Sequence, residues 1–387
     1  MDAAPSVRVF FSTGEASGDM LAAALATAMR ELAPGTTFAG IGSERMESAG
    51  IALTQRTSGW ASLGPIEALR RIPPLLFSGV RHAVWLCVRP WDLIVLVDFG
   101  AFNLRLAQAL RQLGYRRPIL YFFPPGAWFD KPQQARAVAR ATTPLTPFAH
   151  QRDIYESLGL PVVSFGHPLA ALVPARPPRP APPADGGVVA MLPGSRAGEI
   201  ERHLRPLLAA SKVLRARRPR VRFTIAAADA ATETMIAAEL QRAFLPPFVA
   251  EERGESAGTG FEIVRGAAAA LDVADAAWIA SGTAVLEAAL REVPAVAFYI
   301  VSQAQVAIAR RIWKRPYITL PNILLDRCVV PECLQEDATP ERLADEIDAL
   351  LAEPAAQLPG LREVRAALGD PNALERSAAF ALGLARL

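Results

Sequence analysis

Short apolar runs alternate with helical stretches from the beginning of the chain. Residues 7–11 (VRVFF) are apolar apart from one arginine, and a glycine-bearing turn and a helix-favouring stretch follow them. Buried strands of a parallel sheet have this nearly unbroken apolar character. Further strands are expected at 36–41, 92–98, 118–123 and 161–165, with helical patterns between them. The pattern predicts an α/β unit built on a parallel sheet.

A proline-rich segment, residues 173–187 (VPARPPRPAPPADGG), interrupts this alternation. Such a segment forms neither a helix nor a central strand, and it predicts a semi-rigid linker. Strand-like runs then resume as GVVAMLPGSR, VRFTIAAA, AAWIASGT and PAVAFYIV. A chain of 387 residues exceeds the roughly 250–300 at which a single core stops growing. We therefore expect two doubly wound, Rossmann-like α/β domains facing across a ligand-binding cleft, with boundaries at 1–172 and 188–367 and a C-terminal helix, about 368–387, that can pack back on the first domain.

The first predicted turn, GEASGD at residues 14–19, holds two glycines and two carboxylates. It joins a strand to a helix, which is where an open α/β sheet forms its ligand crevice. Glycines at this place let the backbone approach a ligand or take positive φ. The alternative interpretation is a tight turn in which Asp19 caps the helix.

Two further glycine turns lead from strand to helix in the second half, LPGSRAGEI at 192–200 and ASGTAVLEAAL at 280–290. Backbone N–H groups at a helix N-terminus attract phosphate, and the guanidinium of Arg196 can add a bidentate contact. Two such loops in one domain predict a diphosphate site. Neither loop has the P-loop pattern or the dinucleotide pattern G-x-G-x-x-G, which argues against ATP hydrolysis and NAD chemistry.

Charge and cysteine content narrow the class of protein further. The net charge of +3 is too small to indicate a nucleic-acid surface. Three cysteines with no metal-ligand spacing fit a reducing, cytoplasmic compartment, and no apolar run of about 18 residues predicts a membrane span. Residues 66–91 mix arginines with large apolar residues, which fits either a helix lying in a membrane interface or a core-facing helix with solvated arginines.

GEASGD, LPGSRAGEI, SGTAVLEAAL and TLPNILL, with FGHPLA before the linker, occur in an order and spacing that closely resemble lipid-A-disaccharide synthase. The resemblance runs from about residue 7 to the C-terminal helix. It implies an inverting glycosyltransferase of the two-domain GT-B architecture that needs no metal or other cofactor. The implied reaction transfers 2,3-diacylglucosamine from its UDP derivative to 2,3-diacylglucosamine 1-phosphate and gives a β-1,6-linked disaccharide 1-phosphate and UDP. It also implies a cytoplasmic enzyme, peripheral on the inner face of the membrane.

The same resemblance implies the site residues. Asp98, which ends a predicted strand, is the expected base, with Glu15 and Asp19 as competitors for that role, while Arg196 and Asn322 complete the catalytic set. The expected substrate-binding residues are Gly14, Glu15, Ser17, Gly18, Asp19, Asn103, Gly194, Ser195, Ser281, Gly282, Thr283 and Glu287, the last at the ribose hydroxyls.

The chain departs from the family pattern mainly on the acceptor side. Ala101 replaces the second acid of the family's Asp-x-Pro-Asp-Phe-Asn, and the segment FPPGAWFD at 123–130 has Asp130 where the family has arginine. The alternatives are an isomerase similar to UDP-N-acetylglucosamine 2-epimerase and a diverged UDP-sugar-binding protein without turnover. Some family members form dimers, and residues 378–387 could pack within the chain or against a second copy.

Overall fold

The computed structural model describes residues 7–57, 78–125, 132–177, 179–243, 260–303, 305–307, 313 and 315–386. The chain divides into two compact units, one formed by Met1–Leu172 with Leu368–Leu387 and the other by Val173–Ala367. Unit 1 is therefore discontinuous in sequence, whereas unit 2 is a single stretch of chain.

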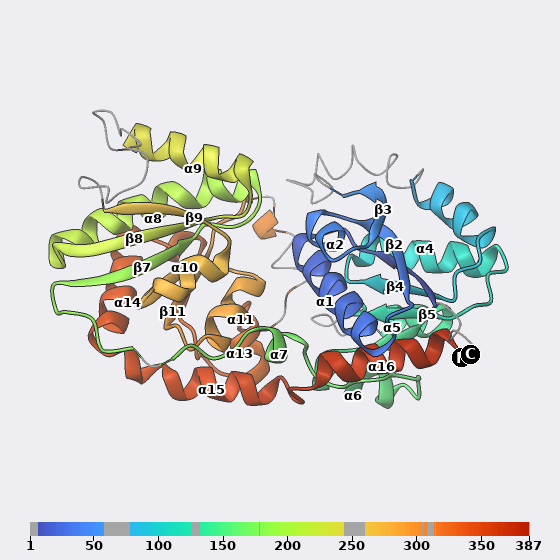
Figure 1. Ribbon diagram of the computed structural model, residues 1–387. Coiled ribbons are helices and arrows are strands. Elements are labelled where there is room, and N and C mark those ends of the chain that lie inside the picture. The colour runs from blue at the N-terminus through green and yellow to red at the C-terminus, as the bar shows by residue number, and fades with distance from the viewer. Residues whose placement is uncertain are drawn as a thin grey trace. The chain divides into compact units, whose positions relative to one another are not determined.

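Unit 1 is a six-stranded parallel sheet in the order β3-β2-β1-β4-β5-β6 (Figure 1). Its strands are β1 Arg8–Ser12, β2 Thr37–Gly42, β3 Ala52–Arg56, β4 Leu93–Val97, β5 Ile119–Phe122 and β6 Thr143–Leu145. Its helices are α1 Ala16–Leu32, α2 Glu44–Ser48, a helix at 78–87, α4 Gly100–Gln112, α5 Pro132–Ala141, α6 Ala149–Ser157, α7 Leu169–Leu172 and α16 Ala373–Ala385. The strand order is that of a doubly wound fold, whose direction of winding reverses between β1 and β4.

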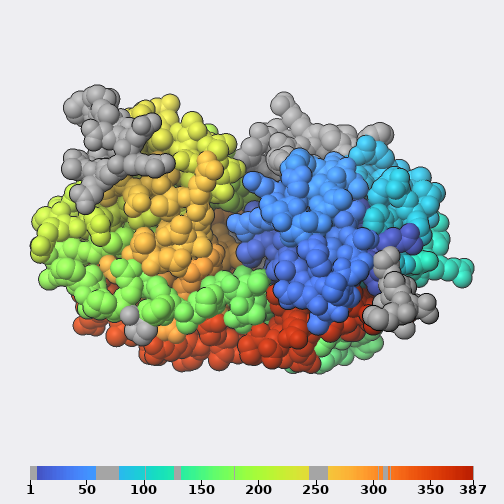
Figure 2. Space-filling view, viewed as in Figure 1, coloured from blue at the N-terminus to red at the C-terminus, as the bar shows by residue number. Residues whose placement is uncertain are grey.

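Successive side chains of β1 explain why helices cover both faces of this sheet. Val9 and Phe11 pack with α1 and α16, while Phe10 packs with α4, α5 and the helix at 78–87. All three side chains are fully buried, which is why the strand is apolar without alternation. The C-terminal helix α16 packs against α1, and in the space-filling view its red atoms border the blue atoms of the first elements (Figure 2).

Unit 2 repeats this topology in the order β12-β11-β10-β7-β8-β9. Its strands are β7 Gly186–Leu192, β8 Arg220–Ala227, β9 Phe261–Arg265, β10 Ala276–Ala280, β11 Ala295–Tyr299 and β12 Glu332–Leu334. Its helices are α8 Ala197–Arg217, α9 Ala230–Ala243, α10 Ala267–Val273, α11 Thr283–Leu290, α13 Leu320–Leu325, α14 Pro340–Ala352 and α15 Leu358–Ala367, with 3-10 turns η1 Gln335–Asp337 and η2 Pro354–Ala356. Winding reverses between β7 and β10, the counterparts of β1 and β4.

The proline-rich segment after Leu172 is held on the surface of unit 2. The guanidinium of Arg176 donates to the carbonyl oxygen of Leu271 at 3.2 Å and to that of Ala274, and Arg179 forms an ion pair of 3.7 Å with Asp275. These contacts fix the segment beside α10 and β10.

The expected α/β fold class with two parallel, doubly wound sheets is confirmed. The expected strand at 161–165 is wrong: only Val163 pairs, in an isolated parallel bridge with Leu145. Gly166, which directly follows this segment, has a positive φ of 102° and pairs with Gly369.

Candidate functional site

The two conspicuous turns of unit 1 lie at the carboxyl ends of the adjacent strands β1 and β4. The turn 14–19 leads into α1, and residues 98–103 lead into α4. These helices cover opposite faces of the sheet, so the chain leaves the two strand ends in opposite directions, which forms a crevice in this kind of sheet. The structure thus brings Gly14, Glu15 and Gly18 close to Asp98.

Gly14 has no side chain because the ring of Phe99 occupies that space. A Cβ built on Gly14 would lie 2.3 Å from ring carbons of Phe99, so any larger residue would have to displace that ring. On the next turn, a Cβ on Gly18 would lie 3.9 Å from the Cβ of Asp98. The glycines therefore let the two turns pack against each other, and contact of Gly14 or Gly18 with a ligand stays a prediction.

Asp98 and Phe99 both have left-handed backbone conformations, with φ of 48° and 47°. Two consecutive residues other than glycine rarely adopt this region, and each costs about 1–3 kcal/mol. The carbonyl oxygen of Asp98 accepts hydrogen bonds of 3.0 Å from the Tyr121 hydroxyl and the Asn103 amide. Surrounding hydrogen bonds therefore hold a strained aspartate at the strand end.

The carboxyl group of Asp98 is set up to exchange a proton near neutral pH. Burial raises its pKa to about 6, and the negative charge of Glu15 adds to this effect, while a hydrogen bond from the Phe99 backbone opposes it. A carboxylate with a raised pKa at a strand end can act as a general base.

The side chains of Asn103 and Asp19 form hydrogen bonds with other groups of the protein. Asn103 is fully buried; its amide accepts from the Ser12 hydroxyl at 2.6 Å and donates to the backbone oxygens of Ser12, Val97 and Asp98. The carboxylate of Asp19 accepts from the backbone N–H groups of Ser43, Arg45 and Met46 at the start of α2, at 2.6 to 3.3 Å. Both expected substrate ligands therefore connect loops, and Asp19 caps α2 rather than its own helix. Ser17 lies half-buried in the first turn of α1.

Unit 2 has the corresponding arrangement at β7 and β10. Residues 193–196 follow β7 and lead into α8, and residues 281–283 follow β10 and lead into α11. The strands are direct neighbours, so the two loops lie side by side at one edge of the sheet. Ser195 and Gly282 are exposed, and Ser281 and Thr283 are half-buried.

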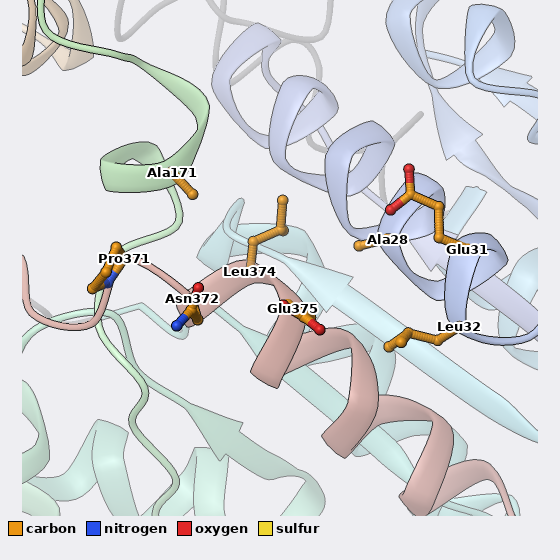
Figure 3. A pocket seen from close by; sticks show the side chains of 8 residues that line it. All are labelled: Ala28, Glu31, Leu32, Ala171, Pro371, Asn372, Leu374 and Glu375. Atoms are coloured by element: carbon orange, nitrogen blue, oxygen red, sulfur yellow. The ribbon is translucent and has the colours of Figure 1, made fainter.

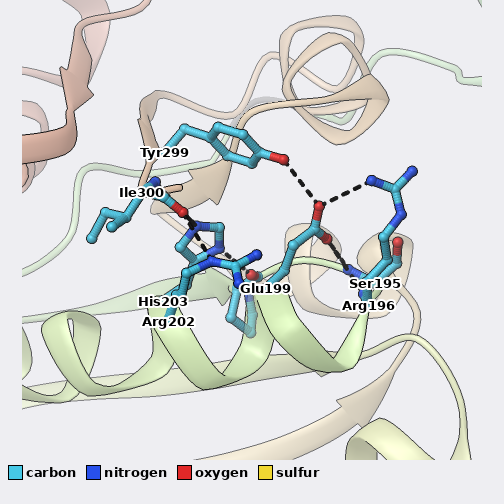
Figure 4. Close-up of polar contacts among 8 residues, drawn as sticks. Ser195, Arg196, Glu199, Arg202, His203, Tyr299 and Ile300 are labelled. Carbon is cyan, nitrogen blue, oxygen red and sulfur yellow. Dashed lines mark hydrogen bonds and ion pairs between the residues drawn. The ribbon is translucent and has the colours of Figure 1, made fainter. Parts of the chain in front are cut away.

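The loop 193–196 is organised by Glu199 in the first turn of α8 (Figure 4). One carboxylate oxygen accepts from the backbone N–H groups of Ser195 at 3.1 Å and Arg196 at 3.3 Å, and the other contacts Arg196 Nη1 at 3.4 Å and the Tyr299 hydroxyl at 3.1 Å. Gly194, with φ of 119°, makes room for this carboxylate, because a Cβ there would lie 2.5 Å from Glu199 Oε2.

His203, one turn further along α8, fastens the same loop to the end of β11 (Figure 4). Its Nδ1 lies 2.7 Å from the carbonyl oxygen of Pro193, and its Nε2 lies 3.0 Å from the carbonyl oxygen and 3.1 Å from the backbone nitrogen of Ile300. Burial lowers the pKa of His203, while its contacts with the backbone oxygens of Pro193 and Ile300 oppose that shift.

Glu287 lies on α11, one turn after the loop at 281–283. Its carboxylate is 3.4 Å from Nε of Arg291, and its side chain is 21% exposed. A Cβ on Gly282 would have no neighbour nearer than 4.0 Å, so the space beside this loop is open.

Asn322, expected among the catalytic residues, is fully buried and surrounded by protein partners. Its amide nitrogen donates to the Val330 oxygen at 2.7 Å and to Glu332 at 2.9 Å, and its oxygen accepts from the N–H groups of Val329 and Val330. All four hydrogen-bonding positions of the amide are occupied. Asn322 thereby fixes α13 to the strand β12, and its place in the catalytic set stays a prediction.

Sequence reasoning missed four side chains of these networks: Tyr121, Glu199 as the centre of its loop, Tyr299 and Glu332. Glu332 accepts from the Thr319 hydroxyl at 2.7 Å and from the Ile318 and Thr319 N–H groups at the start of α13. Only Glu199 had a local signal, its place in the first helical turn after a glycine loop.

Two surface cavities lie apart from these loops. One, of about 240 Å³, lies between α1, α7 and α16 (Figure 3) and is lined by Ala28, Glu31, Leu32, Ala171, Pro371, Asn372, Leu374 and Glu375. Its two carboxylates make it unsuited to a phosphate. The other, of about 350 Å³, lies at the amino ends of β7 and β8, beside Arg179 and Arg220. It is at the opposite edge of the sheet from Ser195.

Several expectations meet the limits of the described residues. The departures at 126–130, including Asp130, and the first part of the 66–91 stretch lie outside them. Within the part of the chain that is described, no cluster of three His, Cys, Asp or Glu side chains could hold a metal ion. No helix within those ranges is long and apolar enough to cross a bilayer.

Comparison with known proteins identifies what this arrangement is similar to. A family model described as lipid-A-disaccharide synthetase matches residues 9–359. Lipid-A-disaccharide synthase from Anaeromyxobacter dehalogenans is 36% identical over 401 residues, covering 98% of each chain. The enzyme of the same name from Thiobacillus denitrificans is 38% identical over 349 residues, covering 88% of this chain and 90% of that one.

Solved structures share the fold at much lower identity. A UDP-GlcNAc 2-epimerase from Neisseria meningitidis, bound to UDP-GlcNAc, superimposes with a TM-score of 0.61 at 11% identity and covers 98% of this chain and 100% of that one. The calicheamicin glycosyltransferase superimposes with a TM-score of 0.56 at 13% identity over 98% of both chains. Identities this low show the GT-B fold alone.

Proposed function

The chain belongs to the lipid-A-disaccharide synthase family, and we propose that its substrates are an acylated amino sugar carried by UDP and an acylated sugar phosphate. The protein is a glycosyltransferase. The transfer joins 2,3-diacylglucosamine to 2,3-diacylglucosamine 1-phosphate through a β-1,6 bond and releases UDP. The observation that supports a working transferase most directly is Asp98, strained at the end of β4 with a pKa raised to about 6.

Asp98 is the proposed general base. The acceptor hydroxyl oxygen attacks C1 of the donor sugar, the bond between C1 and the phosphate oxygen breaks, and its electron pair leaves with UDP. The hydroxyl proton passes to the Asp98 carboxylate, which is ionised above pH 6 and basic enough to accept it. Glu15 contributes negative charge that raises the proton affinity of Asp98.

Unit 2 is the proposed donor-binding unit. Its loops at 193–196 and 281–283 follow adjacent strands, Arg196 directly precedes α8, and Gly282, beside open space, directly precedes α11. Positive charge and N–H donors stabilise the diphosphate as it leaves. Glu287 is the proposed partner of the ribose hydroxyls.

Asn322, Asn103 and Asp19 are proposed as positioning residues. Each fixes a loop that carries or adjoins a substrate-binding residue, through the hydrogen bonds described above. Substitution of any of them is expected to disturb the loop before it changes a substrate contact.

We also propose that the helix at 78–87 contacts the membrane surface where the acylated substrates reside. Val80, Val84 and Val88 are 63%, 51% and 77% exposed at a spacing of four residues, while Ala83 and Leu86 on the other side are buried. Exposed arginines at 81 and 89 flank this stripe. An exposed apolar stripe with basic neighbours is suited to an anionic membrane interface.

Sedimentation with vesicles that contain phosphatidylglycerol tests this contact. Replacing Val80, Val84 and Val88 with serine should weaken binding about tenfold, because roughly 0.5 kcal/mol of apolar transfer is lost at each position, about 1.5 kcal/mol in all. A matched control replaces three scattered exposed residues, Leu32, Leu113 and Val273, with serine. Equal binding by both variants would contradict the proposed surface.

Mass spectrometry tests the reaction itself. The purified protein is incubated with UDP-2,3-diacylglucosamine and 2,3-diacylglucosamine 1-phosphate, beside an Asp98→Asn control. A disaccharide 1-phosphate that forms with the parent protein and is lost in the control supports the proposal. Inversion at C2 of UDP-N-acetylglucosamine without an acceptor would instead establish the epimerase activity, and UDP binding without either product would establish a binding protein.

A further inference from the structure

Glu199 occupies a place where a negatively charged ligand was expected. Its carboxylate accepts from the backbone N–H groups of Ser195 and Arg196, which are two of the donors that the glycine loop offers to a phosphate. Gly194 lacks a side chain because this carboxylate, 2.5 Å from the site of a Cβ, fills the space. The glycine of the LPGSR turn thus accommodates a side chain of the same protein.

The side chains on the two sides of this contact differ in exposure. The side chain of Glu199 is 11% exposed, whereas that of Arg196 is 34% exposed. The Glu199 carboxylate is therefore mostly shielded from solvent, whereas solvent reaches part of the Arg196 side chain. The guanidinium of arginine is a rigid planar fork, so the contact from Arg196 Nη1 to Glu199 at 3.4 Å constrains how the whole fork is oriented.

Glu199 is itself held from the opposite side. The Tyr299 hydroxyl donates to the same oxygen, Oε1, that contacts Arg196, and His203 and Arg202 bond the neighbouring Ile300 to α8 (Figure 4). The carboxylate consequently has a fixed position between β11 and the loop. A charged group fixed in this way imposes one orientation on the guanidinium beside it.

We propose that Glu199 is a positioning residue for donor binding that acts through Arg196. Its carboxylate accepts the hydrogen bonds of the loop's own N–H groups. The guanidinium of Arg196, and not the backbone of this loop, then binds the diphosphate. This inference rests on the proposed donor site. It assigns the backbone contacts to the diphosphate to the start of α11, where a Cβ on Gly282 would have no neighbour nearer than 4.0 Å.

The decisive variant is Glu199→Gln, which keeps the shape of the side chain and an oxygen for the two backbone N–H groups but removes the charge that orients Arg196. Isothermal titration should show UDP binding weakened about tenfold, the range of one charge-assisted hydrogen bond, with uridine binding unchanged because uridine has no phosphate. Tyr299→Phe should change UDP binding in the same direction by a smaller factor. Thermal unfolding confirms that each variant is folded.

A double-mutant cycle shows whether the effect passes through Arg196. In an Arg196→Ala background, Glu199→Gln should cause no further loss of UDP affinity. A residue that only caps α8 would leave UDP binding unchanged in Glu199→Gln, and that result would overturn the proposal. Tighter UDP binding in Glu199→Gln would overturn it too, because the carboxylate would then compete with the phosphates. Equal losses of UDP and uridine affinity in Glu199→Gln would also overturn the proposal. This comparison remains possible even if Arg196→Ala binds UDP too weakly to titrate.

Failure of the proposed donor site has a different signature. In that case neither the parent protein nor Arg196→Ala would bind UDP. If the parent binds UDP and Arg196→Ala weakens binding while Glu199→Gln does not, the donor site stands and only the role of Glu199 is wrong.

Discussion

At the scale of single residues, the raised pKa of Asp98 predicts how catalysis depends on pH. Its pKa of about 6 means that the carboxylate is protonated, and unable to accept a proton, below that pH. The acid limb of kcat/KM should therefore fall through a midpoint near pH 6. In Glu15→Gln the midpoint should move to lower pH, because the negative charge that raises the pKa is gone. A pH–rate profile of both proteins measures this, and an unchanged midpoint would contradict the coupling.

His167 provides a second residue-scale prediction, on stability. Burial lowers its pKa from 6.5 to about 3, and its side chain is 3% exposed. As pH falls below about 6.5 the unfolded chain binds a proton there that the folded chain does not, so the free energy of unfolding decreases by roughly 2 kcal/mol between pH 7.5 and pH 5. Urea unfolding of the parent and of His167→Gln at both pH values isolates this contribution. The same pH sensitivity in both proteins would refute it.

The site residues differ in how far sequence alone can specify them. Asp98 directly follows β4 and Arg196 directly precedes α8 in the loop after β7, so the local pattern predicts their place at a sheet edge. The partners of Asn322 lie at residues 329–332, and one partner of Asn103 is Ser12, 91 positions away. An amide that bonds to a distant backbone has no periodic signature. Whether such a residue faces a ligand or the protein was therefore open until the fold was known.

At the scale of elements, the FGHP turn is the point where the returning chain meets unit 1. Gly166 pairs with Gly369 in an antiparallel bridge, and a Cβ on Gly166 would lie 2.6 Å from the carbonyl oxygen of Leu368. Gly166→Ala should cost about 3 kcal/mol, from positive φ and steric overlap together. Gly114→Ala, at φ of 85° with nothing within 4 Å, should cost only about 1 kcal/mol. Equal losses in urea unfolding would show that the close approach is unimportant.

Interior strands were predictable and edge strands were not. Every residue of β4 is buried, and the apolar run at 92–98 reveals it. In β3, Ala52–Arg56, no residue is fully buried, and β12 is three residues long, so neither produces an apolar run. β3 and β12 each form one edge of their sheet, where one side has no neighbouring strand and fewer side chains need to be apolar.

At the scale of the whole molecule, the unit boundaries predict separable responses to ligand and to truncation. Removing residues 368–387 takes away Ala378, Ala381 and Leu382, which are buried with α1 in the core of unit 1. Unit 2 contains both proposed phosphate loops and none of the removed residues. Calorimetry of a chain ending at Ala367 should lose the cooperative transition of unit 1 and keep a transition that UDP stabilises, by about 2.7 kcal/mol at a hundred times Kd.

The full-length chain is the control for this experiment. Its calorimetric trace should contain both transitions, with UDP acting on the one from unit 2. A truncated chain that keeps both transitions would show that α16 is dispensable for the core of unit 1.

The return of α16 to α1 also decides the order in which the protein can be completed during synthesis. Unit 2 occupies 195 consecutive residues, Val173–Ala367, between the two parts of unit 1. At roughly 5–20 residues per second, the ribosome needs about 10–40 s to translate that stretch. During this interval the first 172 residues have left the ribosome while the apolar face of α1 still lacks its partner helix. The unit that is translated first is thus finished last, and the nascent chain carries an open apolar surface for most of its synthesis.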